Sequence, residues 1–125
     1  NMIYFKYFYL YIIYCEDYDE NSFIGKWLDY GEWADDEYWK LEQSLLKIAK
    51  IYNSNKLVPQ DILVGIMRIV ELLMVPNWTL FSINPIDCKN KQADIYDRFE
   101  RVKVLLSSLF MNDIDFKDYD FNYYH

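Results

Sequence analysis

The sequence predicts a mainly α-helical protein, a single domain built as a bundle of about four to five helices. Three observations favour this fold class. The chain has 125 residues, enough for one hydrophobic core and too few for two ordinary domains. Apolar residues recur every three or four positions along several segments, as they do on one face of an amphipathic helix. Prolines or N-cap residues stand at the ends of these segments. Residues 1–125 are therefore expected to form one domain.

The first predicted helix runs from about residue 22 to residue 30. Ser22 is a good N-cap residue, and Gly31 is suited to end a helix. Trp27 would lie on the apolar side of this helix. Gly25 lowers helix stability by roughly 1 kcal/mol relative to alanine, so we expect a close packing contact at this position.

The next helix is predicted from Asp35 to about Tyr52. Asp35 is expected to be its N-cap, with Asp36 and Glu37 in the first turn, where carboxylates favour the positive end of the helix dipole. The residues that step by three or four along its predicted inner face are Tyr38, Leu41, Leu45, Ile48 and Tyr52.

A third helix is predicted from Pro59 to about Val75, after a loop at residues 53–56. This segment is apolar on most sides, which is typical of a helix at the centre of a core. It is too short to span a membrane. Pro76 would end it.

The last predicted helix runs from about Asp94 to Met111. The residues expected to face inward are Ile95, Phe99, Val102, Leu106 and Leu109, and those expected to face outward are Asp97, Arg98, Arg101 and Lys103. The tail that follows mixes acidic and aromatic residues. Residues 16–39 have the same mixture, which suggests that both segments line one surface.

Residues 2–15, MIYFKYFYLYIIYC, are almost entirely apolar. The run is too short for a transmembrane helix and lacks the small residues of a signal-peptide cleavage site. Its composition favours a strand, whereas the spacing of its apolar residues and its helical neighbours favour a helix. We expect a buried element of the fold and leave both alternatives open.

The net charge of −7 argues against direct nucleic acid binding, which requires a basic surface. Residues 1–37 hold nine acidic residues and only two lysines. This distribution favours a basic protein as the partner.

The sequence contains no recognisable catalytic apparatus, so we expect neither enzymatic activity nor a cofactor. Its single histidine, His125, stands at the end of the chain, which disfavours a histidine-activated nucleophile. Cys15 and Cys88 have neither zinc-ligand nor redox-motif spacing, and two reduced thiols are favoured over one disulfide. No phosphate-binding glycine loop or EF-hand is present.

A binding function explains more of the residues between 16 and 39 than catalysis does. Tryptophan is a favoured interface anchor, and surrounding carboxylates steer a cationic partner. Trp27 and Trp39 are expected mainly as core residues, with Trp33 equally suited to core and interface. The predicted partner-binding residues are Asp17, Asp19, Glu20, Asp29, Glu32, Trp33, Asp35, Asp36 and Glu37.

The runs DYDENSFIGKWLDYGEW and DEYWKLEQSL resemble the small acidic immunity proteins of bacterial polymorphic toxin systems, in particular those of contact-dependent growth inhibition. The resemblance implies a mostly helical cytoplasmic protein that neutralises the C-terminal toxin domain of a large effector. Such toxins are often basic nucleases directed at tRNA, and some act together with an elongation factor. The resemblance implies no catalytic residue in this chain.

Two alternatives of other classes remain. One is a structural or adaptor subunit that uses residues 2–15 as its interface. The other is an enzyme in which a carboxylate pair such as Asp29 and Glu32 performs acid–base chemistry or holds a divalent cation.

Overall fold

The computed structural model describes residues 19–52, 57–74, 77, 80–111 and 119–125. The predictions for residues 2–15, for the loop at 53–56, for Pro76 and for Asp17 lie outside these residues.

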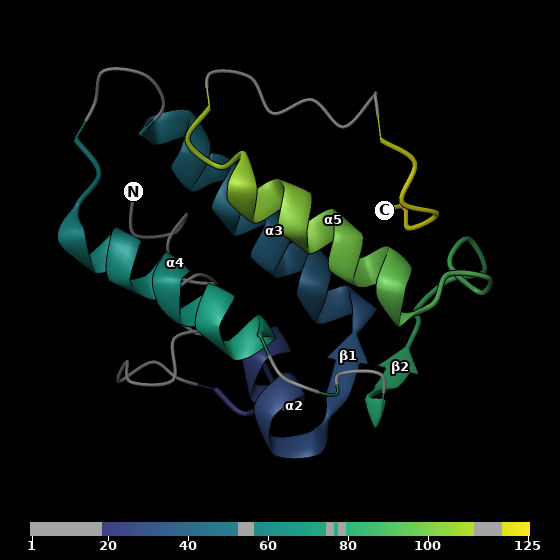
Figure 1. The fold of residues 1–125 in the computed structure, drawn as a ribbon. Coiled ribbons are helices and arrows are strands. Elements are labelled where there is room, and N and C mark those ends of the chain that lie inside the picture. Colours follow the sequence, from purple (N-terminus) through teal and green to yellow (C-terminus); the bar gives the residue numbers. More distant parts are fainter. Residues whose placement is uncertain (1–18, 53–56, 75–76, 78–79, 112–118) are drawn as a thin grey trace.

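The structure confirms the mainly α-helical fold class (Figure 1). The elements in chain order are α2 (Phe23–Tyr30), β1 (Glu32–Ala34), α3 (Asp35–Ile51), α4 (Gln60–Leu73), β2 (Ser82–Asn84) and α5 (Ile95–Ser107). The four helices of the described residues lie where the apolar spacing predicted them. The two short strands were not predicted, because three residues are too few to show an alternating pattern.

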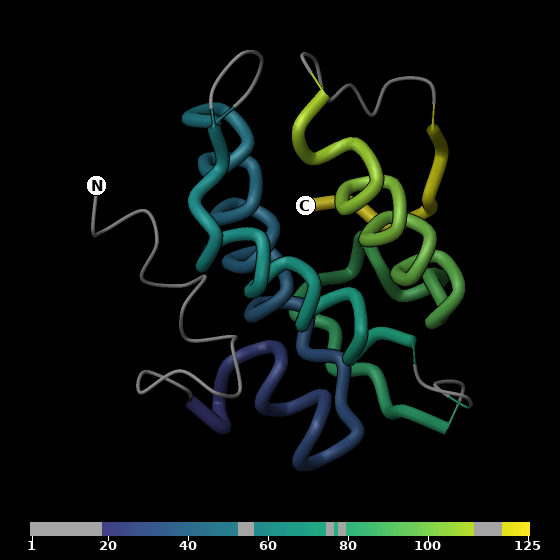
Figure 2. The backbone as a smooth tube through the Cα atoms, turned by 60° about the vertical axis from the view of Figure 1, so that its left-hand side comes forward, coloured from purple at the N-terminus to yellow at the C-terminus, as the bar shows by residue number. Residues whose placement is uncertain are grey.

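Helix α3 supplies the centre of the core. Its inner face agrees with the prediction, since Leu41, Leu45 and Ile48 are fully buried. Helices α4 and α5 lie against it and diverge from each other, as Figures 1 and 2 show. Each of the three contributes buried apolar residues to one continuous cluster.

The expectation that the 59–75 helix is the central one is wrong. Helix α4 buries one face and leaves large apolar side chains on the other exposed. The residues of that exposed face are Leu63, Val64, Met67 and Val70, and Met74 follows at the C-cap. An all-round apolar pattern fits a central helix, but it equally fits a peripheral helix with an apolar outer surface.

Helix α2 and the two strands close one end of the bundle. Ser22 caps α2 by accepting a hydrogen bond from the Gly25 amide at 3.1 Å, and Gly31 ends it in the left-handed conformation with φ of 58°. A Cβ atom at Gly25 would lie 2.3 Å from the Asp19 carbonyl oxygen, so the expected close packing contact is backbone. Strand β1 then pairs in parallel with β2, with Trp33 opposite Ile83.

The N-terminus of α3 differs from its prediction. Ala34 occupies the N-cap position, and Asp35 is the first helical residue, with its carboxylate turned into the core. The start of α5 agrees with its prediction, since Asp94 and Asp97 form a reciprocal capping box. This helix ends at Ser107, a few residues before the predicted Met111.

Among the helices of the described residues, none has the length and apolar character that crossing a membrane requires.

Candidate functional site

Most of the described aromatic residues of the 16–39 stretch are buried beneath its acidic surface, namely Phe23, Trp27, Trp33, Tyr38 and Trp39. Trp33 is fully buried, with its ring centroid 4.7 Å from Phe23, 5.5 Å from Trp27 and 5.1 Å from Tyr38. Several of these pairs meet edge to face, the favourable geometry for aromatic rings. The Trp27 indole also donates a hydrogen bond to the Leu72 carbonyl oxygen at 3.2 Å, which ties α2 to the end of α4. The prediction that Trp33 is an exposed interface anchor is therefore corrected.

Asp35, another predicted partner-binding residue, is fully buried in an ion pair with Arg98. The guanidinium donates to both carboxylate oxygens, from Nε at 2.9 Å and from a terminal nitrogen at 2.8 Å. Its remaining terminal nitrogen donates to the carbonyl oxygens of Ala93 and Asp94. The pair is bidentate, and its role is to join α3 to the start of α5.

A second pair joins the same two helices. Arg101 donates to the two carboxylate oxygens of Glu42 at 2.8 and 3.1 Å. Glu42 is buried and also accepts a hydrogen bond from the Tyr38 hydroxyl at 3.3 Å. Arg101 in addition donates to the Tyr123 carbonyl oxygen at 2.9 Å, so this pair also holds the C-terminal segment.

Tyr123 connects the buried pairs to the aromatic core. Its hydroxyl donates to Asp35 at 2.6 Å and accepts from the Trp33 indole at 3.0 Å. Burial raises the pKa of Tyr123, and the nearby Asp35 carboxylate raises it further. Burial, together with the charge of Glu42, likewise raises the pKa of Tyr38. Both phenols are therefore held neutral in the folded protein.

The expectation that Arg98 and Arg101 face solvent is also wrong. Burial alone would lower the pKa of each guanidinium, but hydrogen bonding and charge pairing with Asp35 and Glu42 raise both pKa values. The sequence did contain a pointer, because Arg98 lies three positions after Ile95 and four before Val102, on the inward face. Charge alone assigned this arginine to the surface.

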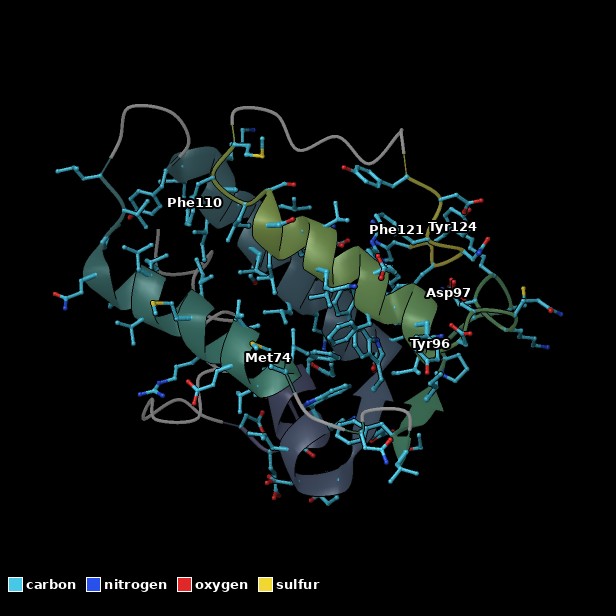
Figure 3. The ribbon with its side chains drawn as sticks, in the orientation of Figure 1. Met74, Tyr96, Asp97, Phe110, Phe121 and Tyr124 are labelled. Atoms are coloured by element: carbon cyan, nitrogen blue, oxygen red, sulfur yellow. The ribbon has the colours of Figure 1, made fainter. Side chains whose placement is uncertain are left out.

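The C-terminal segment, residues 119–125, lies beside α5 and the loop after β2, where Figure 3 labels Phe121 and Tyr124. Phe121 is buried, and the Tyr124 amide donates to Asn90 Oδ1 at 2.8 Å. His125 is exposed and stacks on Trp39 at 4.9 Å. The tail thus contacts the 16–39 stretch through aromatic residues such as Tyr123. Among the described tail residues, the carboxylate-bearing Asp120 is exposed.

The other six predicted partner-binding residues that the structure describes are at least partly exposed to solvent. Glu20, Asp29 and Asp36 are exposed, and the side chains that are partly exposed are those of Asp19, Glu32 and Glu37. These six residues lie around α2 and at the start of α3, at one end of the bundle (Figure 1). We refer to this group of six as the acidic end.

Local contacts order several carboxylates of the acidic end. The Tyr30 side chain is 59% exposed, and its hydroxyl donates to Glu20 at 3.4 Å. The charge of Glu20 is the main reason that the pKa of Tyr30 is raised, with Asp29 adding to it. Asp36 accepts from the Glu37 amide, and Glu37 pairs with Lys40 at 3.0 Å. Within residues 19–37 the only basic side chain is Lys26, so the surface is strongly negative.

The described residues contain no group of three or more His, Cys, Asp or Glu side chains placed to hold a metal ion. Cys88 is an exposed free thiol, and Cys15 lies outside the described residues.

Fold and surface together define a small helical binding protein with a strongly acidic end. A family model described as immunity protein 41 matches residues 10–122. The match spans most of the chain, so the chain belongs to this family of immunity proteins, in agreement with the resemblance seen in the sequence. Its partner is accordingly a cognate toxin. Comparisons with curated proteins and with solved structures each gave no significant match.

Proposed function

We propose that this protein neutralises its cognate toxin by placing the acidic end over a basic, phosphate-binding cleft of a nuclease domain. The observation that carries the proposal is the concentration of six acidic residues, three exposed and three partly exposed, around α2 and the start of α3. A nuclease must attract a phosphate backbone, and a surface with the same sign of charge as that backbone competes for the same cleft.

The arrangement of the acidic end supports recognition rather than stability. Exposed carboxylates contribute little to folding, whereas clustered charges of one sign repel each other and destabilise the compact state. The same charges accelerate encounter with a cationic partner. Trp33 and Asp35 take no part in the proposed surface, because both are fully buried.

Inhibition of this kind requires no catalytic step by the immunity protein. We expect the two proteins to meet in the cytoplasm, where a nuclease directed at tRNA would act. An elongation factor would be a partner only indirectly, by binding the toxin. The assignment to contact-dependent growth inhibition is part of the same proposal.

The test uses the toxin domain encoded next to this protein and measures the association rate by stopped flow at two salt concentrations. Replacing Glu20, Asp29 and Asp36 by lysine should slow association about tenfold or more at low salt, and less at high salt, because counter-ions screen the interaction. The matched control replaces Asp61, Glu71 and Glu100, exposed carboxylates of α4 and α5, by lysine.

Both triple variants change the net charge equally, so the comparison separates a local surface from overall charge. Equal rates for the two variants would remove the acidic end from the interface. Failure of the wild-type protein to bind that toxin domain at all would instead refute the choice of partner.

A further inference from the structure

Strand β2 forms the outer side of the two-stranded sheet, next to β1 (Figure 1). Strand β1 is largely covered, since Trp33 and Ala34 are fully buried, whereas Ser82 and Asn84 of β2 are exposed. Within the described residues, β2 pairs with no strand other than β1. Its outer side is therefore an open strand edge at the surface of the protein.

The hydrogen bonds of β2 show which of its peptide groups face outward. The Ser82 amide donates to the Gly31 carbonyl oxygen at 2.9 Å, so Ser82 directs its N–H toward β1. Successive residues of a paired strand direct their peptide groups to opposite edges, so the N–H and C=O groups of Ile83 face away from β1. Ile83 thus offers one main-chain donor and one acceptor, the groups that an added strand uses.

Exposed apolar side chains flank this open edge. Leu80, two residues before β2, is 79% exposed, and Ile86, two residues after it, is 55% exposed. A segment that pairs with β2 would cover both side chains. Apolar burial would then add to the main-chain hydrogen bonds, as it does at the centre of protein interfaces.

The sheet also connects the open edge to the acidic end. Glu32, one of the six residues of the acidic end, lies opposite Ser82 in the register of the two strands. Side chains at paired positions share one face of a sheet, so a third strand would place alternate side chains on the face of Glu32. Strands are spaced about 4.8 Å apart, so this strand would lie about 10 Å from β1, a distance that Glu32 and a lysine or arginine can bridge together. The edge therefore favours a basic segment.

We propose that an extended, basic segment of the toxin domain adds to the outer edge of β2 as a third strand. Ile83 would exchange main-chain hydrogen bonds with this segment, Leu80 and Ile86 would contact its apolar side chains, and Glu32 would face its basic ones. The inference rests on the toxin domain as partner, as the proposed function does, but it requires neither a nuclease cleft nor the other carboxylates of the acidic end.

The direct test is amide hydrogen exchange measured by NMR on the full chain, free and in complex with the toxin domain encoded next to it. In the free protein the Ile83 amide should exchange faster than the Ser82 amide, which is bonded to Gly31. In the complex, exchange at Ile83 should slow by about tenfold or more, because its amide donates to the added strand. Unchanged exchange at Ile83 in the complex would overturn the proposal.

Two substitutions at one position provide a second measurement. Ile83→Pro removes the outward N–H, and proline is tolerated where a strand N–H faces solvent. Ile83→Ala, the matched control, removes the side chain and keeps the amide. Ile83→Pro should speed dissociation from the toxin domain by about tenfold or more relative to Ile83→Ala, and to the same extent at low and high salt. Equal dissociation rates for the two variants would contradict strand addition, and the exchange measurement on the unmodified chain decides the matter if Ile83→Pro fails to fold.

The outcomes separate this inference from the proposed function. Slowed association of the triple lysine variant of the acidic end, with unchanged exchange at Ile83, would overturn the added strand alone. Slowed exchange at Ile83, with equal association rates for the two triple lysine variants, would support the added strand and remove the acidic end. Slowed exchange at Ile83 in the free chain that increases with protein concentration would indicate pairing with a second copy, which would overturn the proposal.

Discussion

Asp35 and Asp36 are neighbours in the chain, yet their carboxylates occupy opposite environments. Asp35 is fully buried and bonded to Arg98 and Tyr123, whereas Asp36 is exposed at the acidic end. The first holds α3, α5 and the C-terminal segment together. The second belongs to the proposed recognition surface. One acidic stretch therefore contains both a structural carboxylate and a carboxylate of the proposed surface, because the first turn of α3 points the two side chains in different directions.

The two regions also differ in how their charges are compensated. In the core, Asp35 and Glu42 each have a bidentate arginine, and Tyr123 bonds to both pairs. At the acidic end the carboxylates have local partners, such as Lys40 for Glu37 and the Tyr30 hydroxyl for Glu20, and solvent screens them because they are at least partly exposed. Changes in the core should therefore alter stability, and changes at the acidic end should alter binding.

The largest expected effect on stability is that of Asp35→Asn. The substitution leaves Arg98 buried without its counter-charge, which costs about 3–5 kcal/mol of unfolding free energy. Urea unfolding at neutral pH measures this loss. Asp36→Asn, the matched control one residue away, should change stability by less than about 0.5 kcal/mol. Similar losses for the two variants would contradict the division between them.

Tyr123→Phe should have the next largest effect. It removes the hydroxyl that bridges Trp33 and Asp35 and leaves the indole N–H buried without an acceptor, at a cost of about 1–3 kcal/mol. Tyr124→Phe removes an exposed hydroxyl that contacts Asp120, so its unfolding free energy should stay close to that of the wild type. Equal unfolding free energies for the Tyr123 and Tyr124 variants would show that the hydroxyl bridge between Trp33 and Asp35 does not contribute to stability.

The two buried tyrosines should make the fold sensitive to alkali. In the unfolded chain tyrosine ionises near pH 10, whereas the raised pKa values of Tyr38 and Tyr123 keep both neutral in the folded state. Stability is therefore fully present below about pH 10, and each tyrosine lowers it by about 1.4 kcal/mol per pH unit above that value.

Urea unfolding between about pH 10 and 11 measures this slope. Tyr38→Phe and Tyr123→Phe should each reduce it by the contribution of one tyrosine. An unchanged slope in both variants would show that these phenols do not remain neutral in the folded protein.

The sequence predicted the helices well because their apolar spacing and caps are local properties. Ser22, Gly31 and Asp94 mark helix ends by chemistry that acts within a few residues. The β1 and β2 pairing could not be predicted, because the two strands are about 50 residues apart and each has only three residues. The peripheral position of α4 could not be predicted either, because it depends on how the helices pack against one another in the folded protein.

The acidic end was predicted in outline, and the two errors have one cause. Trp33 and Asp35 were included because they stand among carboxylates in the sequence, but Arg98 and Tyr123, which bury them, come from distant segments. Six of the other predicted residues are at least partly exposed, and their role in partner binding stays a prediction. Partners that lie 63 or more positions away decide the burial of the other two.

Hydrogen exchange of the protein, free and bound to its toxin domain, tests whether the acidic end is the toxin-binding surface. We expect slower exchange on binding for backbone amides around the acidic end, at residues 29–37 and near Glu20. The core amides of α3 and α5 around Leu45 and Leu105 should change little. Protection confined to α4 and α5, with none at the acidic end, would show that the toxin binds elsewhere.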